Sequence, residues 1–176
     1  LMSDQYDYEA PANVRSMSLL GAGICFGTEK KVLEAQIHQG YLQTFVSRDI
    51  SIIEGIISIG AEGVTGLCVN HDNSRIAYAY GLNIGLLDSN LEHVTHFSYD
   101  GIPTDVAFSP DGKHLIASGK YGIMYLLELD GTDIKDSDIL FANRENKDVK
   151  TIAWRDNCIA IGEEKTVRTY EVQWQD

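Results

Sequence analysis

His93 and His96 are the only histidines close enough in the sequence to suggest a shared metal ion. Imidazole nitrogen is a common ligand of Zn²⁺ and other transition metals. Both residues fall in an expected strand, where positions three apart point to opposite faces of the sheet. No cysteine lies near them in the sequence. The spacing therefore predicts that the pair binds no metal and that both are ordinary surface or half-buried histidines.

The other reactive side chains also lack the neighbours that catalysis requires. No serine lies in a G-x-S-x-G motif, and no Ser/His/Asp grouping follows from the spacing. Gly21-Ala22-Gly23 leads into an expected strand, whereas a phosphate-binding glycine loop needs a following helix. Glu163-Glu164 and Asp136-Ser137-Asp138 are interpreted as solvated loop charges, with contact to a cation or a basic peptide as the alternative. The sequence therefore assigns no catalytic residue, no metal ligand and no cofactor.

Length and composition are those of a folded domain with an acidic surface. The chain has 176 residues, of which 44% are hydrophobic, and its formal net charge is −12. Nucleic acids and anionic membranes attract clustered positive charge, so neither is expected as a partner. No apolar run reaches the roughly 18 residues that a spanning helix needs, so no membrane insertion is expected. The charge favours partners with a basic surface, although solubility alone also accounts for it.

The cysteines and the first residues bear on the compartment. Cys25, Cys68 and Cys158 are far apart and form no C-x-x-C pair, so we expect buried free thiols in a reducing compartment. No basic segment followed by an apolar one marks a secretory signal, which predicts a cytoplasmic protein. The Leu1-Met2 beginning favours a fragment of a longer protein.

These residues are positioned by a repeated pattern of short strands. Ile24, Ile76, Ile116 and Ile159 each open a short apolar run that contains a small residue. A turn-like segment precedes each run, and Ser109-Pro110-Asp111-Gly112 is the clearest, because proline, aspartate and glycine each favour a turn. Each unit is therefore predicted to contain a strand, a tight turn, a strand, a short turn and a third strand. Further strands are expected at 41–46, 93–99 and 139–142.

The pattern divides the chain into four units, and one of the connections is longer than the others. The units cover residues 13–47, 64–99, 103–142 and 149–173. Residues 48–63, with the sequence RDISIIEGIISIGAEG, form an insertion rich in isoleucine and alanine. It is interpreted either as an extra strand within the first unit or as an apolar docking element for a partner, in which Ile52 and Ile53 make contact.

The repeat length and several motifs resemble those of the WD40 family of β-propellers. Four strands in about 40–45 residues is the length of one propeller blade. Residues 104–112, TDVAFSPDG, resemble the first strand and turn of a WD40 repeat, and residues 84–88 and 167–171 resemble the strand that usually ends in Trp-Asp. No repeat has an intact Trp-Asp pair or the Gly-His dipeptide of the family. The resemblance implies an all-β chain of about four four-stranded antiparallel blades, held together mainly by apolar packing.

The number of blades raises the question of how the ring closes. Members of the family usually close a ring of seven blades, and an open array leaves strand edges bare. The resemblance therefore implies part of a larger propeller, completed by further blades or by another chain. The last unit ends after its third strand. The N-terminal segment, residues 1–12, includes Tyr6 to Glu9, which is a candidate for the missing outer strand.

The resemblance implies a non-catalytic scaffold for protein–protein interaction in a eukaryotic multiprotein complex, located in the cytoplasm or the nucleus. The alternative is a propeller enzyme of the lactonase-like hydrolase type, which needs polar or metal-binding side chains around the central channel. No acid, histidine or arginine recurs at one position of the units, so the scaffold is favoured. Partner contacts are expected in loops on one face of the ring, where binding residues concentrate. The candidates are Lys120, Tyr121, Asp148, Glu163 and Glu164, together with Ile52 and Ile53.

Overall fold

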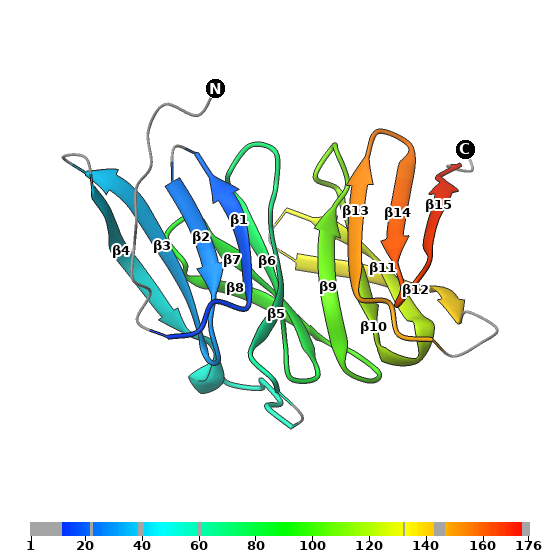
Figure 1. Cartoon of the computed structure of the whole chain (residues 1–176), viewed down its shortest axis with the longest axis horizontal. Helices are drawn as coiled ribbons and strands as arrows, with labels where there is room; N and C mark the ends of the chain where they lie inside the picture. The colour runs from blue at the N-terminus through cyan, green and yellow to red at the C-terminus, as the bar shows by residue number, and fades with distance from the viewer. Residues whose placement is uncertain are drawn as a thin grey trace.

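Four small antiparallel sheets make up the chain (Figure 1). The structure is a computed structural model that describes residues 12–21, 23–38, 41–59, 61–131, 133–142 and 147–173. We call the sheets blades 1 to 4; blade 1 contains β1 (Ser16–Leu20), β2 (Gly23–Gly27), β3 (Lys31–His38) and β4 (Tyr41–Asp49), and blade 2 contains β5 (Val64–Val69), β6 (Arg75–Tyr80), β7 (Asn83–Asp88) and β8 (His93–Ser98). Blade 3 contains β9 (Pro103–Phe108), β10 (His114–Gly119), β11 (Ile123–Asp130) and β12 (Asp133–Ala142). Blade 4 contains β13 (Thr151–Arg155), β14 (Cys158–Gly162) and β15 (Val167–Glu171). Within each blade the strands pair in chain order. The prediction of an all-β chain built from antiparallel blades is confirmed.

Local hydrogen bonds explain why the tight turns form where the sequence places them. In the turn between β9 and β10, the Ser109 hydroxyl donates to Asp111 Oδ1 at 2.6 Å and accepts from the His114 amide at 2.9 Å. Asp111 Oδ1 also accepts from the Lys113 amide at 3.0 Å, and Gly112 has a φ of 70°. These short polar side chains satisfy backbone groups that the turn leaves outside the sheet.

Strand pairing corrects the alignment of one repeat by one residue. Near the end of each first strand, one residue pairs with the residue that opens the apolar run: Leu19 with Ile24, Val69 with Ile76, Phe108 with Leu115, and Trp154 with Ile159. Leu115, and not Ile116, is therefore the equivalent of the other three isoleucines. Both residues are fully buried because β10 is covered on both faces, so hydrophobicity alone did not distinguish them.

Neighbouring blades stack face to face through apolar side chains. Ala77 and Ala79 of blade 2 lie in one cluster with Phe108, Leu115 and Leu127 of blade 3. Similar clusters join blade 1 to blade 2 and blade 3 to blade 4. Large side chains of one blade thus pack against small side chains of the neighbouring blade. This packing fills the space between the sheets.

The four blades form an open arc. The inner strands β1, β5, β9 and β13 lie side by side along the arc (Figure 1). The sheets do not close into a ring, which agrees with a partial propeller. Blade 4 has three strands in the described chain, which agrees with the expectation that the last unit ends after its third strand. The candidate for its outer strand, residues 6–9, lies outside the described residues.

The three cysteines occupy different environments. Cys25 is fully buried, and burial, with a smaller contribution from the Glu34 carboxylate, raises its pKa to about 12. Cys68 is half-buried and Cys158 is exposed. The expectation of buried thiols therefore holds for Cys25 and is wrong for Cys158.

The chain segments that the structure describes contain no helix long and apolar enough to cross a membrane. Their only helices are two single turns of 3-10 helix, Ile50–Ile52 and Lys120–Gly122.

Candidate functional site

Loops of two kinds lie at one end of the blades, because every blade is an antiparallel meander. The turn from the second to the third strand and the segment that enters the next blade share this end, which we call the loop face. It carries the β10–β11 turn and the insertion between β4 and β5, which protrudes at the lower edge of Figure 1. It also carries the β14–β15 turn and the segment before β13.

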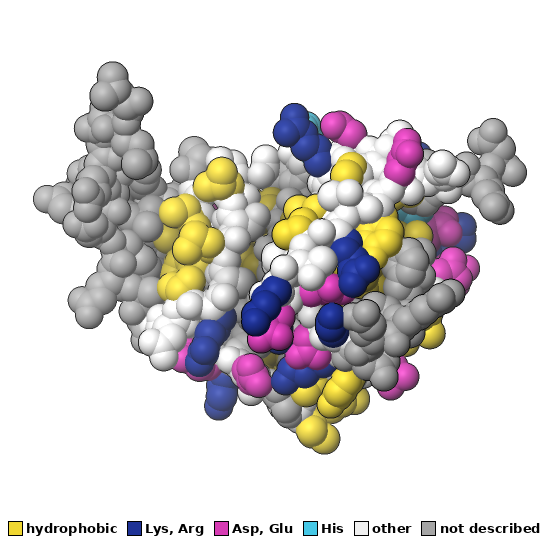
Figure 2. Space-filling model, turned by 45° about the vertical axis from the view of Figure 1, so that its right-hand side comes forward, with side chains coloured by type: hydrophobic (Ala, Val, Ile, Leu, Met, Phe, Trp, Pro, Cys, Tyr) yellow, Lys and Arg dark blue, Asp and Glu magenta, His cyan; other side chains and the backbone are white. Residues whose placement is uncertain are grey.

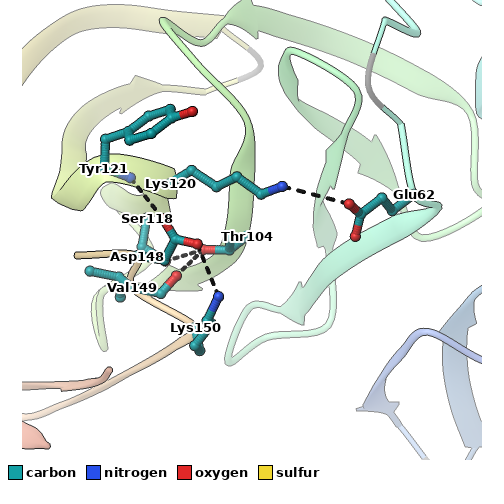
Figure 3. Close-up of polar contacts among 8 residues, drawn as sticks. All are labelled: Glu62, Thr104, Ser118, Lys120, Tyr121, Asp148, Val149 and Lys150. Carbon is teal, nitrogen blue, oxygen red and sulfur yellow. Dashed lines mark hydrogen bonds and ion pairs between the residues drawn. The ribbon is translucent and has the colours of Figure 1, made fainter. Parts of the chain in front are cut away.

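Tyr121 is held at the tip of the β10–β11 turn with its side chain 61% exposed. Its φ is 62°, a left-handed conformation that residues with a side chain rarely adopt. The Tyr121 amide donates to Asp148 Oδ1 at 3.0 Å, and Lys150 Nζ lies 3.0 Å from Asp148 Oδ2 (Figure 3). These two donors, the amide first, lower the pKa of Asp148. Asp148 therefore fixes the turn that presents the Tyr121 ring.

Lys120 links this turn to the insertion. Its Nζ lies 3.6 Å from Glu62 Oε1, and the two side chains point toward each other across the gap between blades 2 and 3 (Figure 3). Such an exposed pair contributes at most about 1 kcal/mol to stability. Lys120 and Tyr121 are neighbours in sequence, but Lys120 contacts a side chain of the same protein, whereas the Tyr121 ring is exposed to solvent.

The insertion is an anchored loop. Asp49 caps the single helical turn by accepting from the Ser51 amide at 3.0 Å. Ile50 is fully buried, Ile53 packs partly against the core between blades 1 and 2, and Ile52 is 77% exposed. The described part of this segment contains no strand beyond the end of β4, so the interpretation as an extra strand is wrong.

Backbone contacts with blade 2 fix the second half of the insertion. The Ile57 carbonyl accepts from the Leu82 amide at 3.0 Å and from the Asn83 side-chain amide at 2.9 Å. Gly81 passes so close that a Cβ added there would lie 2.1 Å from this carbonyl oxygen. Next to this anchor, Ile59 is 73% exposed. The loop thus holds two large aliphatic side chains in water, at a cost in hydrophobic free energy that a partner could recover.

Replacing Gly81 with alanine is expected to detach the insertion from blade 2, because the new Cβ and the Ile57 oxygen cannot occupy the same space. Hydrogen exchange of residues 53–59, followed by mass spectrometry, should accelerate at least tenfold. Gly131→Ala is the matched control, since Gly131 has a φ of 58° but no atom within 4 Å of an added Cβ. Unchanged exchange in Gly81→Ala, or equal acceleration in both variants, would show that the contact does not anchor the loop.

The two candidate glutamates of the β14–β15 turn differ in exposure. The Glu163 side chain is only 1% exposed, and its Oε2 accepts from Arg168 Nε at 3.3 Å. Glu164 is exposed. Glu163 is therefore withdrawn from the surface and serves the internal packing of blade 4, whereas Glu164 remains accessible. The sequence analysis interpreted both as loop charges, because nothing in the sequence indicates that the Glu163 side chain points inward.

The structure brings His93 and His96 together, contrary to the sequence-based prediction. His93 pairs with Leu87 and Thr95 with Leu86, so Val94 is a bulge that restores both histidines to one face. Nε2 of His93 lies 3.3 Å from Nδ1 of His96. Burial is the main influence that lowers the pKa of His93, and the neighbouring Arg48 guanidinium acts in the same direction. Two nitrogens supply half of the ligands of a tetrahedral site, and the described residues contain no group of three or more metal-binding side chains.

A channel between the inner strands is the other hollow of interest. Its volume is about 460 Å³, and residues of β1, β5, β9 and β13 line it. Its Asp105 carboxylate accepts from the Thr151 hydroxyl at 2.8 Å and the Ile152 amide at 2.9 Å, so it joins blade 3 to blade 4. Burial raises the pKa of Cys68, which keeps this thiol protonated. The lining therefore provides inter-blade contacts and no pair of groups arranged for acid–base chemistry.

Comparisons with solved structures agree with this architecture. The chain superposes on the WD40 repeats of RRP9 with a TM-score of 0.75, 11% identity and coverage of 94% of this chain and 50% of that one. For U3-55K the TM-score is 0.73, with 11% identity and the same coverages. The chain has a WD40-like propeller fold. No protein-family model and no curated protein sequence matches it.

This WD40-like chain spans about half the length of the structures that it resembles. At 11% identity the likeness shows the fold alone, so the contact residues depend on the geometry described above. Sequence reasoning missed the exposed Ile59, the Lys120–Glu62 contact and the inter-blade role of Asp105. The isoleucine content of the insertion was the signal that could have identified Ile59. The Lys120–Glu62 contact and the role of Asp105 depend on which blades are neighbours in space, which the sequence does not show.

Proposed function

We propose that this WD40-like array is a non-catalytic scaffold whose loop face binds another protein subunit. The supporting observation is the anchored insertion, which displays Ile52 at 77% and Ile59 at 73% exposure on a rigid frame. Rigid display reduces the entropy lost on binding, and buried apolar side chains supply most of the affinity at such contacts. Tyr121, fixed by Asp148, adds an aromatic anchor on the same face.

Surface charges of both signs favour a partner with both basic and acidic groups. In the view of Figure 2, Lys and Arg side chains are interspersed with Asp and Glu, and hydrophobic side chains protrude at the lower edge. The net charge of −12 still favours approach of a basic surface at low salt. We place the protein in a cytoplasmic or nuclear complex, where its open arc is completed by further blades of its own protein or of another chain. No observation favours the lactonase-like alternative.

The experiment compares one double-site variant with single-site variants in cells. Ile52→Ser combined with Ile59→Ser should lower recovery of co-purifying subunits at least tenfold, because each serine removes an apolar anchor. Ile139→Ser is the matched control, since Ile139 is 64% exposed but lies on the outer strand of blade 3. Tyr121→Gly should weaken recovery as well, and glycine tolerates the left-handed turn. Equal recovery with the isoleucine variant and its control would contradict the proposal.

A further inference from the structure

His93 and His96 occupy the face of blade 2 that is turned toward blade 1. His96 pairs with Gly85 and His93 with Leu87, and Gly85 in turn pairs with Tyr78. Tyr78 and Leu87 belong to the apolar cluster between blades 1 and 2, so both imidazoles lie on the same side of the sheet as that cluster. Both histidines are half-buried. The pair therefore lies in the outer part of the junction between the two blades.

The insertion passes directly over His96. Gly55 has a φ of 83°, and a Cβ added there would lie 2.9 Å from His96 Nε2 and 3.0 Å from His96 Cε1. Along the chain, Gly55 lies between Ile52 and Ile59, the two most exposed isoleucines of the insertion. A movement of the His96 ring therefore acts directly on the segment that displays these side chains.

The contact between the two rings depends on their protonation. Nε2 of His93 lies 3.3 Å from Nδ1 of His96, and the ring centroids are 5.4 Å apart. In an N–H···N hydrogen bond one nitrogen donates and the other accepts with its lone pair, so the accepting ring is neutral. When both rings are protonated, both nitrogens carry hydrogen and both rings are cations. The hydrogen bond is then lost, and repulsion between like charges replaces it.

The charged groups around the pair add to this repulsion. Burial is the main cause of the lowered pKa of His93, and the Arg48 guanidinium of β4 contributes to it. The Glu92 carboxylate, next to His93 in the chain, pairs with Arg48. In the insertion, Glu54 precedes Gly55 and is exposed. The other neighbours on this face carry no charge at neutral pH: Gly85, Leu87 and Tyr78. Protonation of both rings thus places three positive charges beside the Glu92 carboxylate.

We propose that the His93–His96 pair is a pH-sensitive switch that holds the insertion on blade 2 while at least one of the two rings is neutral. In acid the second ring takes up a proton, the rings separate, and Gly55 loses its support on His96. The insertion then no longer holds Ile52 and Ile59 in fixed positions, so binding of a partner at the loop face should weaken. This last step rests on the proposed function, whereas the release of the insertion does not.

The direction of the pH effect follows from the lowered pKa of His93. The detached state binds the proton more readily than the attached state, in which the ring is partly buried beside Arg48. The attachment is therefore at full strength above about pH 6.5, the ordinary pKa of histidine. It weakens as the pH falls from there through the lower pKa of the attached state.

Hydrogen exchange of the whole chain at pH 7.5 and pH 5.5 tests the switch, with each rate divided by that of an unstructured peptide at the same pH. Protection of residues 53–57 should fall at least threefold at pH 5.5, whereas residues 76–79 of β6 should keep theirs. His93→Gln should abolish the fall, because glutamine can still bond to His96 but takes up no proton. His71→Gln is the matched control, since His71 is exposed in the β5–β6 turn, and it should respond like the wild type.

An NMR titration of the wild type provides the test if His93→Gln does not fold. The Gly55 amide resonance should shift with the same midpoint as the imidazole resonances of His93 and His96. Unchanged protection at pH 5.5, an equal fall in His93→Gln, or a Gly55 resonance that does not follow the imidazoles overturns the proposal.

Recovery of co-purifying subunits separates this result from the loop-face proposal. Recovery should fall at pH 5.5 for the wild type and not for His93→Gln. If the free chain shows the release in acid but the Ile52/Ile59 double variant recovers subunits normally, the loop-face proposal fails and the switch stands. If the double variant loses its subunits but the free chain shows no release, the switch fails and the loop-face proposal stands.

Discussion

Replacing Gly85 with alanine is expected to lower the free energy of unfolding by about 3 kcal/mol, the upper part of the range for overpacked cores. Gly85 of β7 pairs with Tyr78 of β6, and the tyrosine ring lies directly over it. An added Cβ would lie 2.1 Å from Tyr78 Cζ. Tyr78 is fully buried between blades 1 and 2, so the ring has no open space to enter. Chemical denaturation monitored by circular dichroism measures the loss.

A double-mutant cycle shows whether the ring causes this loss. Tyr78→Leu shortens the side chain over Gly85, so Gly85→Ala should cost at least 1 kcal/mol less in that background. Tyr78→Phe is a useful control, because the Tyr78 hydroxyl is buried without a hydrogen-bond partner in the described chain. Removal of that hydroxyl should not destabilise the protein. Additive effects of Gly85→Ala and Tyr78→Leu would mean that the two sites do not pack as described.

Replacing Asp105 with alanine is expected to cost about 2–3 kcal/mol, because the buried Ile152 amide and the Thr151 hydroxyl then lose their acceptor. Both donors belong to blade 4 and the carboxylate to blade 3, so the loss falls on the junction between them. Exchange of β13 amides should accelerate more than exchange of β6 amides. Uniform acceleration across all blades would contradict a local role for Asp105.

Asparagine at the same position separates the charge from the hydrogen bonds. Burial is the largest influence on Asp105 and raises its pKa, although three hydrogen bonds act in the opposite direction. The folded state thus holds the proton more tightly than the unfolded state. The resulting stability is fully present below the unfolded pKa of about 3.9 and is lost as the pH rises through the folded value. Wild type should therefore gain stability relative to Asp105→Asn between pH 7 and pH 4. A relative loss over that range would contradict the burial of this charge.

The strands were predictable from the sequence because their turns contain residues with a local mechanism. Ser109, Asp111 and Gly112 satisfy or relax the backbone of one turn without help from distant residues. The side of the sheet toward which each strand residue points was harder to predict. Ile116 and Leu115 are both apolar and both buried, so only the pairing with Phe108 shows which of them faces blade 2.

The candidate site was predictable where it depended on exposed apolar content and unpredictable where it depended on bulges or neighbouring blades. The isoleucines of the insertion stood out in sequence, and Ile52 is indeed exposed. The bulge at Val94 reverses the expected facing of His93 and His96, and no turn residue marks it. Glu163 turns inward to Arg168 because the short turn brings the two strands together.

Hydrogen exchange of the free chain and of the chain in its purified cellular complex tests the central claim most directly. A scaffold that binds through the loop face should show slower exchange in the complex at residues 50–59 and 120–122. The tight turns at the opposite end, including residues 109–113, should exchange at the same rate in both samples. Protection at those opposite turns, with unchanged exchange across the insertion and the Tyr121 turn, would contradict the account.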